Sequence, residues 1–340
     1  MSEVAERVLG GQPGRARLRR PAQTCAAVIT APRTVALREV PLLDPGPDEV
    51  RLRMEGCGVC GSNLPIWQGR PWFEYPLLPG EPGHEGWGVV EAAGSEVTAI
   101  REGDRVASLG GGAFADRLVV SAGSVLQVPR ALDGLPAAGE PLACAMNVFR
   151  RAKIQPGETV AVVGIGFIGA AVARLAADAG AQVLAFSRRQ FALDLARRLG
   201  AEAAWPSGDA QEAVLRAAEL SHGRLCDCVI EAAGLQSTLD LAARLCRDRG
   251  RLVVAGYHQD GLRSVDMRLW NWRGLDVINA HEREPTVYLE GMRLAFQAVS
   301  SGRIDPRLLF THRHPLASLS DAFRALEERP DGFLKGVVLA

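Results

Sequence analysis

The chain has 340 residues, 47% of them hydrophobic, which is enough for two domains that each bury a core. Its 39 lysines and arginines balance 39 aspartates and glutamates, and a formal net charge of zero argues against nucleic acid or an anionic membrane as a partner. No apolar run approaches the roughly 20 residues of a membrane-spanning helix, and an odd number of cysteines, seven, favours a reducing cytoplasm over a disulfide framework.

The N-terminal stretch of residues 1–24 is predicted to be a disordered tail. It lacks the apolar centre of a secretory signal. Its arginines raise the alternative of a transit peptide, but Glu3, Glu6 and the Gly-Pro content favour a solvated segment.

A β-rich domain is predicted next, from about residue 26 to residue 128. Short runs of apolar and β-branched residues alternate there with Gly and Pro turns. The predicted strands are AAVIT, TVALREV, EVRLRM, WGVVEAAG, DRVASL, DRLVV and SVLQV.

After Gly157 the pattern changes to an alternation of buried strands and amphipathic helices. The strands are TVAVVG, QVLAF, CDCVIEAAG and RLVVAG, and the helices are AAVARLAADAG, FALDLARRLG and STLDLAARLCRD. This alternation predicts an α/β domain with a doubly wound parallel sheet covered by helices on both faces. A further helix, TVYLEGMRLAFQAVSSG, and the segment HPLASLSDAFRALEE lead to a closing strand, KGVVLA, which is expected to return to the first domain. The predicted division is 25–148 with 287–340 for the β-rich domain and 149–286 for the α/β domain.

A dinucleotide-binding turn is predicted at the start of the α/β domain. The strand at 159–163 runs directly into Gly164-Ile165-Gly166-Phe167-Ile168-Gly169 and then into a helix. The first two glycines permit a tight turn and close approach of the backbone to a pyrophosphate, and the third permits packing of helix on strand. The helix N-terminus then faces the negative charge. A merely structural turn is the alternative.

The end of the second strand bears on the choice of nucleotide. A carboxylate at that point grips the ribose 2′-hydroxyl of NAD, whereas this chain has Ser187-Arg188-Arg189. A hydroxyl and two guanidiniums can bind a 2′-phosphate, which favours NADP(H) over NAD(H). The alternative is that both arginines are solvated residues at the start of a helix.

Metal-binding side chains occur at three distant places. They are Cys60 in GCGVCGSNLP, His84 and Glu85 in PGHEG, and Glu140 in EPLACA. Sulfur, nitrogen and oxygen donors gathered on one site suit a tetrahedral zinc with one position open to substrate.

Taken together, the ordered motifs place the chain near a known family. GVCGSN, PGHEGWGVVEAAGSEV, GDRV, EPLACAMNVFRRA, GETVAVVGIGFIG and VIEAAG resemble the zinc-dependent medium-chain dehydrogenase/reductase family of the alcohol dehydrogenase superfamily, in particular its sorbitol dehydrogenase branch. The resemblance implies a GroES-like catalytic domain beside a Rossmann cofactor domain. It implies hydride transfer between NADP(H) and a secondary alcohol or polyol, or the matching ketone, by a homodimer or homotetramer.

The resemblance also implies roles for single residues. Zinc would be held by Cys60, His84 and Glu140, with Glu85 as a nearby ligand that binds directly or through water. Cys144 competes with Glu140 for the third position. Ser62 would pass the substrate proton, so the catalytic group is Cys60, Ser62, His84 and Glu85. Cys57 is expected to be a packed bystander.

Three departures from the family pattern stand out. The segment 107–113 replaces a four-cysteine lobe, so a structural zinc is not expected. Asn63 stands where relatives carry an aspartate that orients a ligand, and Pro65 stands where many carry a relay histidine. Proline cannot carry a proton.

Other residues are placed near the nicotinamide by the resemblance. Gly256 and Tyr257 belong to this group, and His258 or His281 could replace the missing relay histidine, although a solvated loop histidine is the alternative. The aromatic segment 67–75 is expected either to line a substrate cleft or to close a small core. Two other functions stay open: a zinc-free reductase of quinones or enones, and a catalytically silent nucleotide-binding protein.

Overall fold

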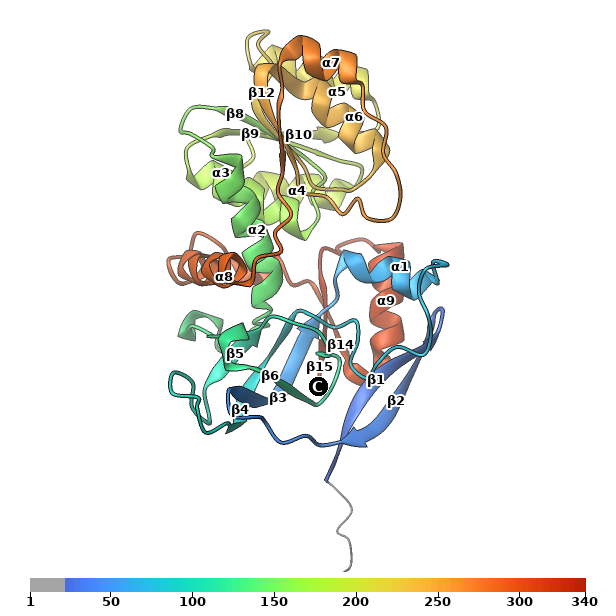
Figure 1. The fold of residues 1–340 in the computed structure, drawn as a ribbon. Coiled ribbons are helices and arrows are strands. Elements are labelled where there is room, and N and C mark those ends of the chain that lie inside the picture. The colour runs from blue at the N-terminus through green and yellow to red at the C-terminus, as the bar shows by residue number, and fades with distance from the viewer. Residues whose placement is uncertain (1–21) are drawn as a thin grey trace, which may run out of the picture.

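The structure, a computed structural model, describes residues 22–340. Most of the predicted tail, residues 1–21, lies outside the described part. The first strand already begins at Gln23, slightly before the predicted start of the β-rich domain. The described chain forms two domains, one above the other in Figure 1, with α2 (Gly139–Ala152) and α8 (Pro285–Ser300) between them.

The lower domain is built on an antiparallel hairpin and a larger, mostly antiparallel sheet. All seven strands predicted in its N-terminal part are present. They are β1 (Gln23–Ala31), β2 (Thr34–Pro41), β3 (Glu49–Gly58), β4 (Gly86–Ala93), β5 (Arg105–Ser108), β6 (Arg117–Ser121) and β7 (Val125–Gln127). The order in the larger sheet is β14-β15-β3-β4-β5-β7, with β6 pairing β3.

The C-terminal segment returns to this domain, which confirms the prediction. The closing strand β15 (Gly336–Leu339) pairs antiparallel with β3, with Val338 opposite Cys57, and β14 (His312–Pro315) pairs parallel with β15. Helix α9 (Leu319–Glu328) covers the domain core, where Phe323 stacks on Trp67. Trp67 belongs to the short helix α1 (Leu64–Gln68).

The upper domain contains a six-stranded parallel sheet in the order β10-β9-β8-β11-β12-β13. Its strands are β8 (Thr159–Val163), β9 (Gln182–Ser187), β10 (Ala203–Pro206), β11 (Cys226–Glu231), β12 (Cys246–Val254) and β13 (Asp276–Asn279). Its helices are α3 (Phe167–Asp178), α4 (Gln190–Arg198), α5 (Ala210–Leu220), α6 (Gln236–Leu245) and α7 (Met267–Arg273). Strands β10 and β13 and helices α5 and α7 were not predicted, and the predicted helix STLDLAARLCRD extends past α6 into the residues that begin β12.

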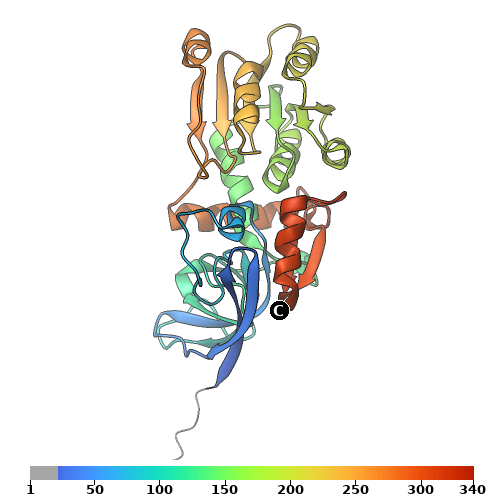
Figure 2. The same cartoon turned by 90° about the vertical axis from the view of Figure 1, so that its right-hand side faces the viewer.

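Helices cover both faces of this sheet, as predicted (Figures 1 and 2). Alternate residues of the central strand face opposite cores: Val160 and Val162 pack with α3 and α4, while Ala161 and Val163 pack with α5 and α6. A strand that is buried on both faces has an almost continuous apolar sequence. For this reason TVAVV could be predicted as a buried strand.

The predicted domain boundaries both fall inside helices. Residue 148 lies within α2 and residue 287 within α8, so each helix contains residues from both sides of a predicted boundary. The 148/149 and 286/287 boundaries therefore stay predictions. Helix α8 packs directly on α2 between the two domains (Figure 2).

Five short 3-10 turns lie in the lower domain, and the first of them directly precedes α1: Gly61–Asn63, Ala122–Ser124, Arg130–Leu132, Pro306–Leu308 and Leu316–Ser318. Within residues 22–340, no helix has the length and apolar character needed to cross a membrane. All seven cysteines lie in this part of the chain as free thiols.

Candidate functional site

A cavity of about 1340 Å³ lies between the two domains and collects almost every residue that the sequence analysis singled out. Its walls include the predicted catalytic and metal-binding residues Cys60, Ser62, His84, Glu85 and Glu140. They also include the predicted nucleotide-binding residues Gly164, Gly166, Phe167, Ile168, Ser187, Arg188, Arg189, Gly256 and Tyr257. Gly169 is the one exception, because it packs beneath the turn.

Three donor side chains meet on the side of this cavity that the lower (catalytic) domain forms, opposite the upper (cofactor) domain. The Cys60 sulfur, a His84 ring nitrogen and a Glu85 oxygen all lie within 4.8 Å of one another. The two segments meet because Cys60 follows β3 while His84 and Glu85 precede β4, and these strands pair with Cys57 opposite Gly86. Two antiparallel strands thus bring together a thiol, an imidazole and a carboxylate that are separated in the sequence.

Asn63, one of the departures from the family pattern, holds these two segments together. Its side-chain oxygen accepts the backbone N–H of Cys60 at 3.1 Å, and its amide nitrogen donates to the Pro82 carbonyl at 3.2 Å. His84 Nδ1 lies 2.8 Å from the same carbonyl. Because a carbonyl only accepts, Nδ1 carries a proton, and once the imidazole is neutral Nε2 has the lone pair that can bind a metal. The Pro82 carbonyl therefore orients His84 without a carboxylate.

Glu85 has a partner that the sequence analysis missed. Its Oε1 accepts a hydrogen bond from Lys335 Nζ at 2.5 Å, and both side chains are buried. The same ammonium lies 5.3 Å from the centre of the Phe167 ring in the nucleotide turn. A signal existed, because Lys335 is one of only two lysines in the sequence and immediately precedes an apolar strand.

The other oxygen of Glu85 tests whether a zinc ion suits the site. Oε2 is buried and has no hydrogen-bond partner among the described residues. A buried carboxylate oxygen without a partner carries a desolvation cost that a cation would remove. One thiolate, one imidazole and carboxylate oxygens also form a usual donor set for catalytic zinc. The residues present therefore fit zinc.

Glu140 lies beside this group and is linked to Cys144 and Tyr288. The Cys144 thiol donates to Glu140 Oε1 at 3.2 Å, and its sulfur lies 3.4 Å from the Tyr288 hydroxyl. Burial and the Glu140 charge raise the pKa of Cys144 well above its usual value. Burial and Cys144 also raise the pKa of Tyr288, a residue of α8 that no sequence pattern had indicated. A protonated thiol that donates to Glu140 is less suited to bind a metal than the carboxylate itself.

The charges around His84 favour its protonated form when no metal is present. Burial opposes the imidazolium, but the hydrogen bond to Cys60 and the interactions with Cys60, Glu85 and Glu140 outweigh it and raise the pKa of His84 to about 10. Groups that favour a positive charge surround this imidazole, so the site suits a cation.

The nucleotide turn shows a different requirement at each glycine. Gly164 has φ +99°, and a Cβ there would lie 2.7 Å from the Ala233 Cβ. A Cβ on Gly169 would lie 2.0 Å from the Gly164 carbonyl oxygen, so this residue permits helix α3 to approach the strand. A Cβ on Gly166 would meet no atom within 4 Å. Gly166 thus borders open space in the cavity, where a pyrophosphate would pass.

The end of β9 carries the three residues predicted to select the nucleotide. Ser187 Oγ accepts the Arg189 backbone N–H at 3.3 Å. The Arg189 guanidinium donates to the Phe333 carbonyl, and to the Ile165 carbonyl at 3.3 Å. Arg188 remains exposed at the rim of the cavity. The two arginines therefore lie in different surroundings, although they are adjacent in the sequence.

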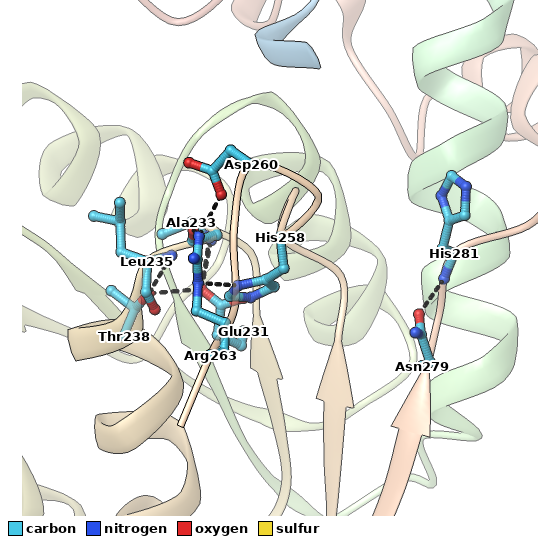
Figure 3. Close-up of polar contacts among 10 residues, drawn as sticks. Glu231, Ala233, Leu235, Thr238, His258, Asp260, Arg263, Asn279 and His281 are labelled. Carbon is cyan, nitrogen blue, oxygen red and sulfur yellow. Dashed lines mark hydrogen bonds and ion pairs between the residues drawn. The ribbon is translucent and has the colours of Figure 1, made fainter. Parts of the chain in front are cut away.

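The two histidines proposed to replace the relay also differ (Figure 3). His258 Nε2 lies 2.7 Å from Glu231 Oε2, and Arg263 Nε donates to His258 Nδ1 at 3.0 Å. Since Nδ1 accepts, it carries no proton, and Nε2 is the nitrogen that donates to Glu231. Both nitrogens of His258 are thus occupied. His281 stands apart on the cavity wall, with its backbone N–H bonded to Asn279.

Glu231 is the buried centre of this network (Figure 3). Its Oε1 accepts from the backbone N–H groups of Ala233 and Gly234 and from the Thr238 hydroxyl, at 2.7 to 2.9 Å. A Cβ on Gly256 would lie 2.5 Å from Glu231 Oε2, so this position has room only for glycine. Glu231 is the glutamate of the VIEAAG motif, for which the sequence predicted no role.

A second, smaller cavity of about 450 Å³ opens beside Ser62 and His84. Trp72, Phe73 and Tyr257 line it. The aromatic segment is therefore divided, because Trp67 is buried in the catalytic-domain core and Tyr75 packs against that core. The interpretation that the segment closes a core is confirmed for Trp67 and Tyr75, and a substrate cleft at Trp72 and Phe73 stays a prediction.

Two parts of the sequence match family descriptions. Residues 46–130 match the alcohol dehydrogenase GroES-like domain, and residues 167–295 match the zinc-binding dehydrogenase domain. The fold and the donor group together define a class, that of zinc-binding dehydrogenases with a nicotinamide cofactor. The chain belongs to the zinc-binding medium-chain alcohol dehydrogenase family, whose members are NAD(P)-dependent polyol and alcohol dehydrogenases.

Individual relatives include polyol enzymes. L-galactonate-5-dehydrogenase of Escherichia coli K12 is 27% identical over 88% of this chain and 94% of its own length. Sorbitol dehydrogenase of Ovis aries is 28% identical over 89% of this chain and 93% of its own length. An alcohol dehydrogenase of Rhizobium meliloti 1021 is 31% identical over 68% of this chain and 76% of its own length. A solved structure named as a zinc-binding dehydrogenase from Sinorhizobium meliloti 1021 bound to NADP has a TM-score of 0.81 at 27% identity, over 94% of this chain and 100% of that chain.

Proposed function

We propose that this protein is a zinc-dependent, NADP(H)-preferring oxidoreductase that interconverts a secondary alcohol of the polyol or sugar type with the matching ketone. One observation carries the proposal: a compact thiol, imidazole and carboxylate group shares a cavity with the glycine turn. Hydride transfer needs the nicotinamide ring and the reacting carbon side by side, and a cavity between two domains can hold both.

The metal would be held by Cys60 and His84, with Glu85 and Glu140 as the two carboxylates available to it. When bound, zinc acts as a Lewis acid that lowers the pKa of an alcohol and stabilises its developing negative charge. The rest of the site belongs to the protein. Asn63 and the Pro82 carbonyl orient Cys60 and His84, and the buried ammonium of Lys335 partly neutralises Glu85.

Ser62 is the proposed group that takes the substrate proton in the oxidative direction and returns it in reduction. It lines both cavities, and the neighbouring Pro65 cannot pass a proton further. His258 is engaged on both nitrogens, so of the two histidines His281 is the one that remains available for an onward path.

The substrate class follows from the smaller cavity and from the relatives. Trp72 and Phe73 provide apolar walls, while Glu81 and Gln259 provide polar groups that can bind hydroxyls. A polyhydroxylated chain presents both kinds of surface. Three of the relatives are named for L-galactonate, D-arabinitol and sorbitol, all of which carry several hydroxyls.

The preference for NADP(H) is supported by the absence of a carboxylate at the end of β9, where Ser187 and Arg188 border the cavity. Steady-state kinetics should favour NADPH over NADH by at least about tenfold in kcat/KM, which corresponds to roughly 1.4 kcal/mol. Equal efficiencies would mean that the two arginines are only solvated residues.

We also propose a homodimer formed through the edge strand β13. Trp272 is 87% exposed, and Met267 and Val277 are 60% and 44% exposed on or beside this edge. An open edge with exposed apolar side chains is suited to pairing with a second copy by two-fold symmetry. Val277→Lys should then shift the mass measured by light scattering from dimer to monomer. The free thiols and the odd cysteine count support a cytoplasmic location.

Metal analysis with turnover tests the function itself. Protein purified without chelators should contain about one zinc per chain, because segment 109–116 between β5 and β6 has no cysteine or histidine for a second ion. It should oxidise at least one polyol from a panel of sugar alcohols. Less than about 0.2 zinc per chain would favour the zinc-free reductase. Nucleotide binding without turnover on any alcohol or carbonyl would favour a silent binding protein.

A further inference from the structure

The rim of the interdomain cavity brings together two arginines from different domains. Arg188 follows β9 in the cofactor domain, and Arg329 follows α9 in the C-terminal part of the catalytic domain. Both line the same cavity, together with Ser187 and Ser207. Only the two arginines at the end of β9 were predicted to bind the nucleotide.

Neither guanidinium has an acidic partner in the described part of the chain. Arg105, Arg247 and Arg251, in contrast, each lie within 2.7 Å of a carboxylate. Arg329 keeps solvent exposure at the rim, and desolvation by the surrounding atoms and the nearby charge of Arg188 both lower its pKa. Two like charges held near each other in a cavity are unfavourable unless an anion joins them.

Two carboxylates lie close by but do not serve as that anion. Glu328 lines the cavity, and the charge of Asp331 acts on Arg189, yet neither forms an ion pair with these arginines among residues 22–340. The neighbouring Glu327 is already paired with Arg33 and Gln68. The position between Arg188 and Arg329 is therefore available to a ligand.

Arg189 has a different task, which is to hold the segment that carries Arg329. Its guanidinium connects the Phe333 carbonyl of the catalytic domain to the Ile165 carbonyl of the nucleotide turn. Phe333 is itself buried, so this connection is anchored in the core. Arg329 caps α9 with φ +49°, which gives its backbone a defined direction at the end of the helix.

We propose that Arg329 joins Arg188 in binding the 2′-phosphate of NADP(H), so that this phosphate is recognised by both domains at once. The proposal rests on the proposed preference for NADP(H). A guanidinium can donate two parallel hydrogen bonds to a phosphate, and two guanidiniums suit its double negative charge. Ser187 Oγ accepts from Arg189, which leaves its hydroxyl proton free to donate to the same phosphate. Binding then also ties the catalytic domain to the cofactor domain.

The test compares Arg329→Gln with Arg188→Gln and with the control Arg324→Gln. Arg324 lies on α9, five residues before Arg329, pairs with Asp321 and is exposed to solvent. Dissociation constants for NADPH and NADH, and for 2′,5′-ADP and 5′-AMP, are measured by protein fluorescence. R329Q should weaken NADPH and 2′,5′-ADP by about tenfold and NADH and 5′-AMP by less than about twofold. R324Q should change none of them.

Folding is checked separately, because the variant must remain native for the comparison to count. Arg329 has no ion-pair partner among residues 22–340, so the midpoint of thermal unfolding without nucleotide should not fall in R329Q. Arg329→Lys keeps the charge and should recover part of the NADPH affinity. The double variant should lose less than the sum of the single losses, since both arginines bind one phosphate.

The outcomes separate this proposal from the cofactor preference. If the unmodified protein does not prefer NADPH, the proposed preference for NADP(H) is wrong, and the proposed role of Arg329 is wrong with it. If it prefers NADPH and R188Q loses the preference while R329Q keeps it, only the role of Arg329 is overturned. An equal loss of NADPH and NADH in R329Q would also overturn it, because the side chain would then not be reading the 2′-phosphate.

Discussion

The metal-binding group and the nucleotide turn lie on the same cavity but are constructed in opposite ways. The nucleotide turn is one continuous segment from β8 to α3, and its three glycines act through backbone shape. The candidate metal-binding group combines Cys60, His84 and Glu85, lies beside Glu140, and is joined by Lys335 from the C-terminal end. One site depends on local backbone conformation and the other on long-range charge.

This difference predicts how each site should fail. A change at a glycine of the turn should act through the local backbone and should leave the catalytic domain undisturbed. A change in the metal-binding group should affect both stability and activity, because buried charges in it depend on one another. Four experiments address this contrast.

The largest effect is expected for Cys60→Ala, with Cys57→Ala as the matched control. C60A removes a donor from the metal group, so zinc content should fall and turnover should decrease by at least about a thousandfold, since Lewis-acid stabilisation is worth several kcal/mol. Cys57 is buried in the core of the catalytic domain and its thiol donates to the Gly58 carbonyl, so C57A should keep its zinc. Metal analysis and kcat/KM check both, and loss of zinc in C57A would mean that the two cysteines act as a pair.

Lys335→Met should have the next largest effect, on stability. Lys335 and Glu85 form an ion pair whose side chains are 6% and 0% exposed. Removing one partner of a buried pair leaves an uncompensated charge and costs about 3–5 kcal/mol. Denaturant unfolding of the metal-free protein measures this. The double variant Lys335→Met with Glu85→Gln should recover part of the loss, and equal stability of the single and double variants would contradict the pairing.

Glycine substitutions in the turn should separate binding from folding. Gly166→Ala has open space for its Cβ, so the free energy of unfolding should stay level or rise by up to about 1 kcal/mol. Its Cβ occupies the space of the pyrophosphate, and NADPH should bind about tenfold more weakly. Gly164→Ala should instead destabilise the fold by about 1–3 kcal/mol, because of its φ of +99° and the close Ala233. Identical behaviour of the two variants would count against this distinction.

The smallest effect is a proton released when zinc binds. The pKa of His84 in the metal-free protein is raised to about 10, so this imidazole is protonated at pH 7 and must lose about one proton to bind a metal. The apparent zinc affinity should therefore rise by at least about tenfold per pH unit between pH 6 and pH 8. Calorimetry in two buffers with different ionisation enthalpies counts the protons. A pH-independent affinity would show that His84 is neutral before zinc binds.

Much of the fold could be predicted because its strands have clear local patterns. The buried run TVAVV and the seven strands of the catalytic domain were correctly predicted, as were α3, α4 and α8. Helix α7 and strand β13 were missed, because their side chains are largely exposed and carry no clear apolar period. The start of β12 was taken as helix, since STLDLAARLCRD keeps a helical period beyond the point where α6 ends.

The candidate site was less predictable than the fold. Motif spacing was enough to select Cys60, His84, Glu85 and Glu140, but not to find Lys335 or Tyr288. Nothing in the sequence indicates that Arg188 and Arg189, which are neighbours, would differ in role. That difference arises because the Phe333 carbonyl, from a distant segment, is present for one guanidinium and absent for the other.

The sequence by itself determined the family, the two domain types and the glycine turn, because each of these is written in contiguous residues whose backbone and packing requirements are local. Only the tertiary structure decided which polar and charged groups lie near one another: Glu85 with Lys335, Asn63 with the Pro82 carbonyl, and Arg188 with Arg329. Electrostatic interactions depend on distance and burial rather than on sequence separation, so they exist only once the chain has folded.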